Sequence, residues 1–191
     1  MTRRTYIKII VSVGLLGFLF FWFGRKIGFY RVPDLSVLQQ KKNLITELTE
    51  TIIPQTDSPG AAQANVAEFV IDYVRDCAPV NEQRNFARGL MKLEKYSLRT
   101  YGCSFVECKS ADRIAILERF EDDAVSRISI INKINNKLFG KPFIGQLKEL
   151  TVEGYCTSEL GATQGLAYDY IPVHYEACTF LGVEQKSWAT K

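Results

Sequence analysis

The sequence predicts an all-α (mostly α) fold, a small helical domain that follows an N-terminal apolar segment. Apolar residues recur at helical spacing in several segments, and helix start and stop signals separate these segments. No segment shows the sustained alternation that is typical of strands. With 191 residues, of which 47% are hydrophobic, the chain is long enough for one well-packed domain. We therefore expect residues 1–31 to form a signal or anchor, and residues 32–191 to form one helical domain with an irregular C-terminal tail.

The N-terminal apolar run covers residues 9–23, which contain no charged side chain and lie between Lys8 and Arg25. This run is short for a membrane span, which takes about 20 residues, and slightly long for the core of a signal peptide. It therefore fits either an anchor or a cleaved leader. Because no small-x-small cleavage site follows it, we favour an uncleaved anchor that holds the protein to the membrane.

Residues 2–8, TRRTYIK, resemble the twin-arginine export signal, in which Arg3, Arg4 and Lys8 are the basic residues. The alternative is an ordinary anchor whose arginines follow the positive-inside rule. The twin-arginine interpretation implies that the body crosses the membrane already folded. It places the protein at the periplasmic side of the bacterial inner membrane, either anchored there or exported.

The first three predicted helices follow this segment. The first runs from a cap at Asp34 or Ser36 to about Ile53. The second begins at Pro59, whose fixed φ suits the first turn of a helix, and runs to about residue 76. The third covers residues 82–99. The residues predicted to face inward are Leu38, Leu44, Ile45, Leu48, Ile52, Val66, Phe69, Val70, Tyr73, Cys77, Phe86, Leu90 and Leu93.

Residues 101–108 are predicted to form a loop, and Ser110 caps a fourth helix. Residues 125–138 fit a helix better than a strand, because two adjacent asparagines disfavour a buried strand. A last helix is predicted from Pro142 to about residue 160. The inward residues expected in the fourth and last helices are Ile114, Leu117, Phe120, Ile144, Leu147, Leu150, Thr151, Gly154 and Tyr155.

The charge distribution argues against a nucleic-acid partner. The chain has 24 basic and 21 acidic residues, and six of the basic ones lie in residues 1–31, which contain no acid. The remaining 18 basic and 21 acidic residues give the body a net charge of −3. A nucleic-acid-binding domain would need a basic body.

No motif for catalysis or cofactor binding occurs in the sequence. The nucleophile elbow G-x-S-x-G, the dinucleotide motif G-x-G-x-x-G and the phosphate loop G-x-x-x-x-G-K-[ST] are all missing. The chain has one histidine, His174, which we interpret as structural. We therefore expect no catalytic residue, no metal site and no cofactor in this chain.

The five cysteines leave three alternatives open. None lies in a C-x-x-C motif. An exported location permits disulfides, for which Cys103 with Cys108 and Cys156 with Cys178 are the candidate pairs. Buried free thiols are equally compatible with the sequence. An enzyme that uses a reactive thiol such as Cys156 would need an exposed thiol of low pKa.

Two segments resemble the family of gluconate 2-dehydrogenase small subunits, also called subunit 3. Residues 50–70 resemble its entry motif, through Ile53, Pro54, Thr56, Asp57, Pro59, Gly60, Ala61, Ala64, Val66 and Phe69. Residues 147–178 resemble its closing signature, through Leu150, Thr151, Gly154, Tyr155, Thr157, Ser158, Glu159, Gly161, Ala162, Thr163, Tyr168, Pro172, Tyr175 and Cys178. Cys156 stands where the family more often has an aromatic residue.

This resemblance implies an accessory subunit without a redox group. Its implied partner is a large flavoprotein of the glucose-methanol-choline oxidoreductase type, which holds FAD and oxidises a sugar or polyol. A cytochrome c subunit often accepts the electrons. The small subunit is implied to bind and stabilise the flavoprotein and to lend it the export signal.

Six residues are candidates for the contact with the partner. Thr157, Ser158 and Glu159 place hydrogen-bonding groups at the end of a predicted helix, and Gly161 lets the backbone turn there. Tyr168 and Tyr175 are of a type that anchors protein interfaces. The alternative is that Gly161 only ends the helix and the tyrosines pack on the domain's own core.

A different function is also compatible with the sequence. The chain could be an independent, membrane-tethered periplasmic binding or structural protein, since no motif in it demands an oxidoreductase. A stable flavoprotein partner would distinguish the accessory subunit from this alternative.

Overall fold

The computed structural model describes residues 12–19, 34–124, 140–169, 178, 180, 182 and 185–189. The chain divides into two compact units, Met1–Pro33 and Asp34–Lys191. In the first unit, residues 12–19 are helical, and the rest of the predicted leader lies outside the described residues. No helix in the described part of the chain is both long and apolar enough to cross a membrane.

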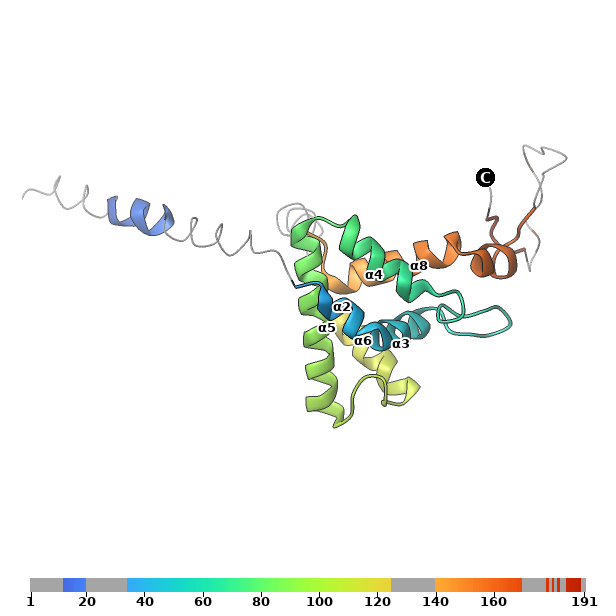
Figure 1. The fold of residues 1–191 in the computed structure, drawn as a ribbon, viewed down its shortest axis with the longest axis horizontal. Coiled ribbons are helices and arrows are strands. Elements are labelled where there is room, and N and C mark those ends of the chain that lie inside the picture. Colours follow the sequence, from blue (N-terminus) through green and yellow to red (C-terminus); the bar gives the residue numbers. More distant parts are fainter. Residues whose placement is uncertain are drawn as a thin grey trace, which may run out of the picture. The chain divides into compact units, whose positions relative to one another are not determined.

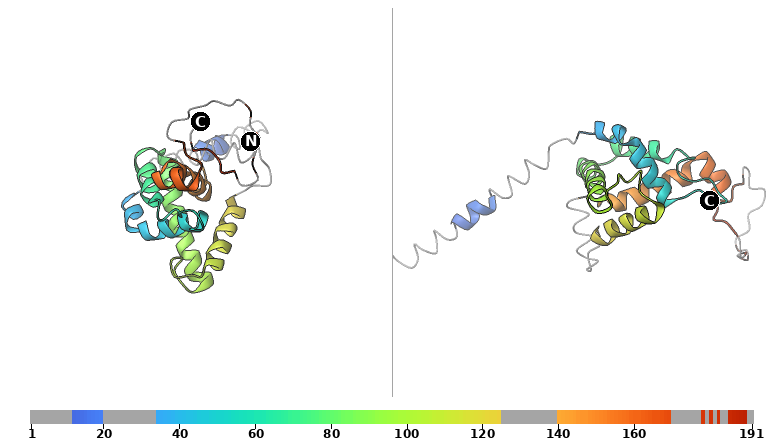
Figure 2. Two further views of the ribbon diagram at one scale, coloured as in Figure 1. Left: turned by 90° about the vertical axis from the view of Figure 1, so that its right-hand side faces the viewer. Right: turned by 90° about the horizontal axis from the view of Figure 1, so that it is seen from below.

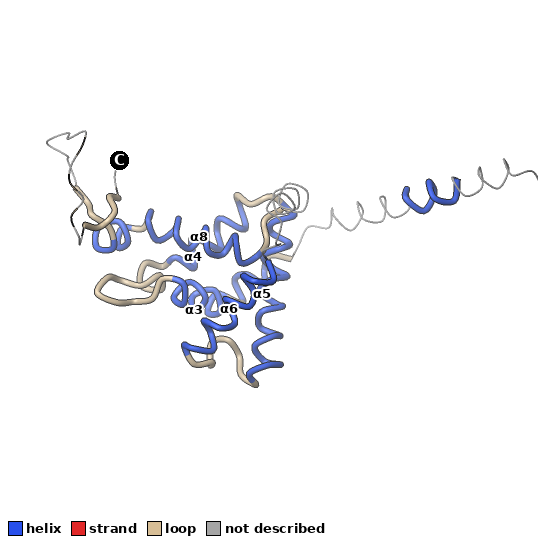
Figure 3. Tube along the Cα trace, turned by 180° about the vertical axis from the view of Figure 1, so that it is seen from behind, coloured by secondary structure: helices blue, strands red, loops and turns tan. Residues whose placement is uncertain are grey.

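The second unit is helical, as predicted, and the part of it that the structure describes contains no strand (Figure 3). Its long helices pack around a central helix, α8, which contacts α3, α4, α5 and α6 (Figure 1). An isolated β-bridge joins Ala167 and Trp188. The elements are α2 (Ser36–Gln40), α3 (Lys42–Ile52), α4 (Val66–Asp76), α5 (Val80–Tyr101), α6 (Ser110–Ala124), α8 (Phe143–Thr157) and the π-helix η1 (Gly161–Gly165).

The hydrophobic core consists of the faces that helical periodicity predicts. Phe86 on α5 is fully buried and meets Phe143 on α8 edge to face, with ring centroids 5.2 Å apart. Gly89 lies against the same Phe143 ring, where a Cβ would overlap it. The predicted inward residues that are buried are Leu38, Leu44, Ile45, Leu48, Val66, Val70, Phe86, Leu90, Leu93, Leu117, Ile144, Leu147, Leu150, Thr151, Gly154 and Tyr155.

The first predicted helix is in fact two helices. The backbone of Lys41 leaves the helical region, so that α2 and α3 meet at a joint. The Lys41 ammonium lies 2.7 Å from the Glu94 carboxylate on α5. Lys41, at the joint, therefore forms an ion pair with α5. The predicted end of the first helix near Ile53 is confirmed, since α3 ends at Ile52.

The second helix begins later than predicted. Pro59 lies in a loop of residues 53–65, and α4 begins only at Val66. Asn65 has a left-handed φ of 54°, which an α-helix that began at Pro59 could not contain. At the other end of α4, Cys77 is exposed rather than inward, because the helix stops at Asp76 and the chain turns toward α5.

Helix α6 starts at Ser110, as predicted, but one residue of its predicted inward face points outward. Ile114 is exposed, whereas Ile116 and Leu117 are buried and Phe120 is half-buried. Two residues along a helix turn the side chain by about 200°, so Ile114 lies on the side away from Ile116. Residues 125–138, for which a helix was predicted, lie outside the described residues.

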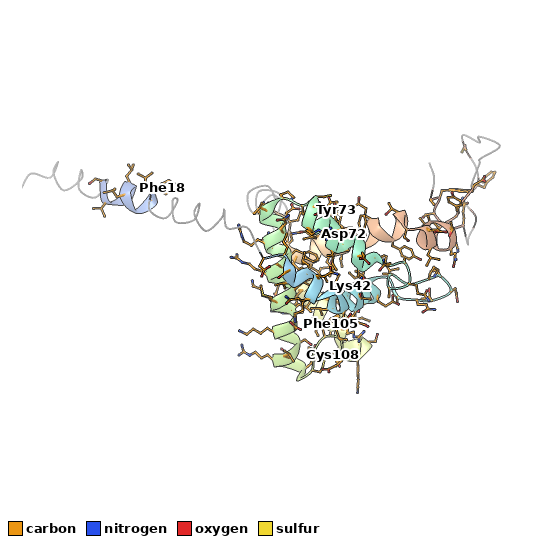
Figure 4. All side chains as sticks on the ribbon, viewed as in Figure 1. Phe18, Lys42, Asp72, Tyr73, Phe105 and Cys108 are labelled. Atoms are coloured by element: carbon orange, nitrogen blue, oxygen red, sulfur yellow. A yellow bond between two sulfur atoms is a disulfide. The ribbon has the colours of Figure 1, made fainter. Side chains whose placement is uncertain are left out.

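The loop between α5 and α6 is closed by a disulfide between Cys103 and Cys108. Of the two candidate pairs, this one is formed, while Cys156 and Cys178 are free thiols. Between the bonded cysteines, Phe105 is fully buried in the core, and Figure 4 shows Phe105 and Cys108 at the same end of the domain. The buried Ser97 hydroxyl donates to the Cys103 carbonyl at 2.8 Å.

Reduction of this disulfide should lower the free energy of unfolding by about 2 kcal/mol, the loop-closure entropy expected for so short a loop. Urea unfolding of the full chain with and without dithiothreitol measures the difference. A variant with Cys103→Ala and Cys108→Ala is the control, since dithiothreitol should not change its midpoint. An unchanged midpoint for the natural sequence would contradict the prediction.

Candidate partner-binding surface

The loop of residues 53–65 is tied back onto the end of α3 by backbone hydrogen bonds. The Ala61 amide donates to the Ile53 carbonyl at 2.9 Å, so the second half of the loop folds back beside its first residue. The Glu50 carboxylate accepts hydrogen bonds from the amides of Gln55, at 2.8 Å, and Ala62, at 2.9 Å. A Cβ on Gly60 would come within 2.7 Å of the Gln55 nitrogen, so only glycine fits there.

Glu50 is a structural residue of this loop that the sequence analysis did not identify. It lies in the last turn of α3, where a negative charge is disfavoured by the helix dipole. An acid at such a position is a signal that another contact compensates for this cost. Here the compensation comes from two backbone amides of the loop that follows.

Tyr155 on α8 joins this loop to the end of α8 and to η1. Its ring is buried, and its hydroxyl donates to the Pro59 carbonyl at 2.7 Å. Gly165 of η1 lies so close that a Cβ there would come 2.5 Å from the Tyr155 hydroxyl oxygen. At the preceding residue, a Cβ on Gly154 would come 2.6 Å from the Phe69 ring of α4. The two segments that resemble the family therefore pack directly on each other.

The end of α8 passes into η1 through hydrogen bonds of Ser158. Its hydroxyl donates to the Tyr155 carbonyl at 2.7 Å and accepts from the Gly161 amide at 3.0 Å. Gly161 is buried against the Tyr155 carbonyl, which a Cβ would overlap. The predicted helix to residue 160 is therefore shorter than expected, and the tail begins with a π-helix rather than with an irregular segment.

We call residues 53–65 together with residues 155–165 the loop–η1 end. In Figure 1 both segments extend to the same side of the domain, away from α5, and Figure 2 shows the same arrangement. Its exposed side chains include Gln55, Thr56, Asp57, Thr157, Glu159, Thr163 and Gln164. The exposed surface of this end is therefore polar, and hydrogen bonds and close packing hold its backbone in place.

The predicted contact residues fall into three groups. Thr157, Glu159 and Tyr168 are exposed, although the Thr157 hydroxyl also donates to the Glu153 carbonyl at 2.7 Å. Ser158 and Gly161 are turned inward and shape the backbone. Tyr175 lies outside the described residues, as do His174 and the basic residues Arg3, Arg4 and Lys8 of the predicted export signal.

One carboxylate beside the loop has a shifted pKa. Hydrogen bonds from the Lys42 ammonium, at 2.8 Å, and from the Asn65 amide lower the pKa of Glu68, which is exposed on α4. A lowered pKa keeps Glu68 ionised at neutral pH, and the attraction is lost as the pH falls through that pKa. An ion pair between α3 and α4 therefore lies next to Asn65, the last residue of the loop.

The described residues hold no group of three or more histidine, cysteine or acidic side chains that could bind a metal ion. Cys156 is half-buried and free. The interactions that the described residues make at this end are hydrogen bonds and close packing.

A comparison with protein families shows to which family this chain belongs. The model of the family described as gluconate 2-dehydrogenase subunit 3 matches residues 39–173, more than half of the chain. This chain belongs to that family. No curated protein and no solved structure gives a significant match. The members of this family are subunits of dehydrogenase complexes, which implies partner subunits. The matched range contains both segments of the loop–η1 end.

Replacing Tyr155 by Phe should destabilise the domain by about 1–2 kcal/mol, because the hydrogen bond to the Pro59 carbonyl is lost inside a packed site. Tyr168→Phe is the matched control, since Tyr168 is exposed, and its effect should stay within about 0.5 kcal/mol. Thermal unfolding by circular dichroism compares the two variants. Equal midpoints would show that the Tyr155 hydroxyl does not hold the loop.

Proposed function

We propose that this protein is the accessory small subunit of a membrane-associated, flavin-dependent sugar or polyol dehydrogenase of the gluconate 2-dehydrogenase type. In this proposal the chain is not catalytic and binds no cofactor itself. FAD belongs to a large flavoprotein subunit, which this chain binds and stabilises. A cytochrome c subunit completes the electron path in complexes that contain one.

The observation that supports this proposal best is the packing of the two family-like segments into one end of the domain. The hydrogen bond between Tyr155 and Pro59 spans 96 positions of sequence, and close-packed glycines lie on both sides of it. A backbone held this rigidly presents its exposed groups in one arrangement, which lowers the entropy cost of binding. We place the contact with the flavoprotein at the loop–η1 end, with Thr157 and Glu159 among the contacting side chains.

The leader completes the proposal. Arg3, Arg4 and Lys8 would direct export by the twin-arginine route, and residues 9–23 would hold the complex at the periplasmic side of the inner membrane. Because this route transports folded proteins, the flavoprotein could load FAD before it crosses as a passenger. Replacement of both arginines by lysine should retain both subunits in the cytoplasm.

The test of binding is an affinity pull-down of the C-terminally tagged full chain from detergent-solubilised membranes. We expect a yellow flavoprotein to co-elute, with dye-linked sugar or polyol oxidation in the eluate. Glu159→Arg should reduce its recovery, whereas Glu149→Arg, an exposed acid on the body of α8, should not. A colourless, solitary and inactive protein would instead favour an independent tethered binding protein.

A further inference from the structure

The outer side of the C-terminal half of α5 is unusually basic. Its exposed residues recur at intervals of one and three positions, which places them on one side of the helix. The opposite side of the same helix holds Leu90 and Leu93 in the core. We call this exposed side the α5 basic face, and it consists of Arg88, Met91, Lys92, Lys95, Leu98 and Arg99.

The four cations of this face are Arg88, Lys92, Lys95 and Arg99. Among the described residues, none of them forms an ion pair, and the neighbouring acid, Glu94, is already paired with Lys41 at 2.7 Å. The body of the protein has a net charge of −3, so the face is a local basic patch on an acidic domain. Figure 4 shows long side chains that extend from this side of α5.

Two apolar side chains stand between the cations. Met91 is 48% exposed and Leu98 is 52% exposed, although both are large and hydrophobic. Together with Glu94, Lys95 and Arg99 they line a shallow depression on the helix, in which the carboxylate of Glu94 is the one paired with Lys41. Exposed apolar side chains that alternate with cations along one helix side match the two layers of an anionic lipid surface, its headgroups and the acyl boundary below them.

We propose that the α5 basic face binds the anionic surface of a phospholipid bilayer. The charge of the face complements an anionic surface, and Arg88 to Arg99 include no exposed aromatic side chain of the type that anchors protein interfaces, so we choose lipid over a protein partner. Figures 1 and 2 show α5 on the side of the domain away from η1, so lipid and a partner at the loop–η1 end could bind together. The inference holds whether or not the proposed function is correct.

The test measures whether α5 itself contacts the bilayer. Binding of the whole protein to vesicles would not show this, because the apolar leader could itself bind vesicles. A polarity-sensitive nitrobenzoxadiazole label is placed at Met91→Cys in the full chain. We expect its emission to shift to the blue with vesicles of phosphatidylcholine that contain one third phosphatidylglycerol, but not with phosphatidylcholine alone. Salt at about 0.5 M should reverse the shift by screening. The background variant removes the free thiols, as Cys77→Ser, Cys156→Ser and Cys178→Ser.

Two controls separate specific binding from general adhesion. A label at Val152→Cys on α8, where the natural side chain is 50% exposed, should not respond. Replacing the four cations of the face by Gln should reduce the Met91→Cys response at least tenfold. Removal of four cations elsewhere in the domain should leave the response intact, as in the control variant Lys42→Gln, Arg75→Gln, Arg119→Gln and Lys141→Gln.

Three results would overturn the proposal. The first is a label at Met91→Cys that is unaffected by anionic vesicles, and the second is an equal response at Met91→Cys and Val152→Cys. The third is a response to a co-purified protein subunit in place of vesicles, which would assign the face to a protein. Circular dichroism of each variant verifies that the helical domain is folded before the comparison.

Discussion

Replacing Gly161 by Ala should weaken binding of the flavoprotein partner by at least tenfold. The added Cβ would overlap the Tyr155 carbonyl, which is backbone and cannot rotate away as a side chain would. The chain must therefore shift between α8 and η1, at a cost of about 1–3 kcal/mol for overpacking. This shift displaces Thr157 and Glu159, which we place in the contact.

The matched control is Gly145→Ala on α8, the helix that precedes η1. A Cβ at Gly145 would lie 3.6 Å from Pro142, an ordinary contact, and alanine favours the helix by up to about 1 kcal/mol. The fraction of flavoprotein recovered per tagged subunit should fall for Gly161→Ala and stay unchanged for Gly145→Ala. Unchanged recovery for both variants would show that the loop–η1 end is not the contact.

Replacing Phe105 by Ala should destabilise the domain by about 3–5 kcal/mol, the usual cost of removing a buried aromatic ring. Phe105 is fully buried, and the Arg113 guanidinium lies 5.8 Å from its ring centroid. Arg113 also donates to the Phe105 carbonyl at 3.1 Å and forms an ion pair with Glu47 on α3. Loss of the ring would therefore loosen the contact of this loop with both α3 and α6.

The next residue supplies the control for this prediction. Val106 is exposed, so Val106→Ala should change the free energy of unfolding by no more than about 0.5 kcal/mol. Urea unfolding of the full chain, followed by far-ultraviolet circular dichroism, measures both variants. If Phe105→Ala lowers the free energy of unfolding by less than about 1 kcal/mol, the loop is not anchored through this ring.

Helical periodicity was sufficient to predict the fold class and most of the core. The predicted inward residues of α3, α5 and α8 are buried except for the half-buried Ile52, because burial of one apolar stripe is required of any helix that packs on others. The predicted start of α4 at Pro59 was wrong, because the preference of proline for the first turn of a helix is only local. The loop around Pro59 is stabilised instead by Glu50 and Ile53, which precede it in the chain.

The sequence by itself determined the helical class, the short disulfide loop as a candidate and the resemblance to the subunit 3 family, since local spacing and motifs are sufficient for each. Only the tertiary structure decided which side chains meet. Tyr155 and Pro59 are distant in sequence, yet their hydrogen bond shapes the candidate surface. Phe105 was part of a predicted loop, yet its ring is buried in the core. The physical reason is that burial and hydrogen-bond partners depend on how the helices pack, which no local pattern records.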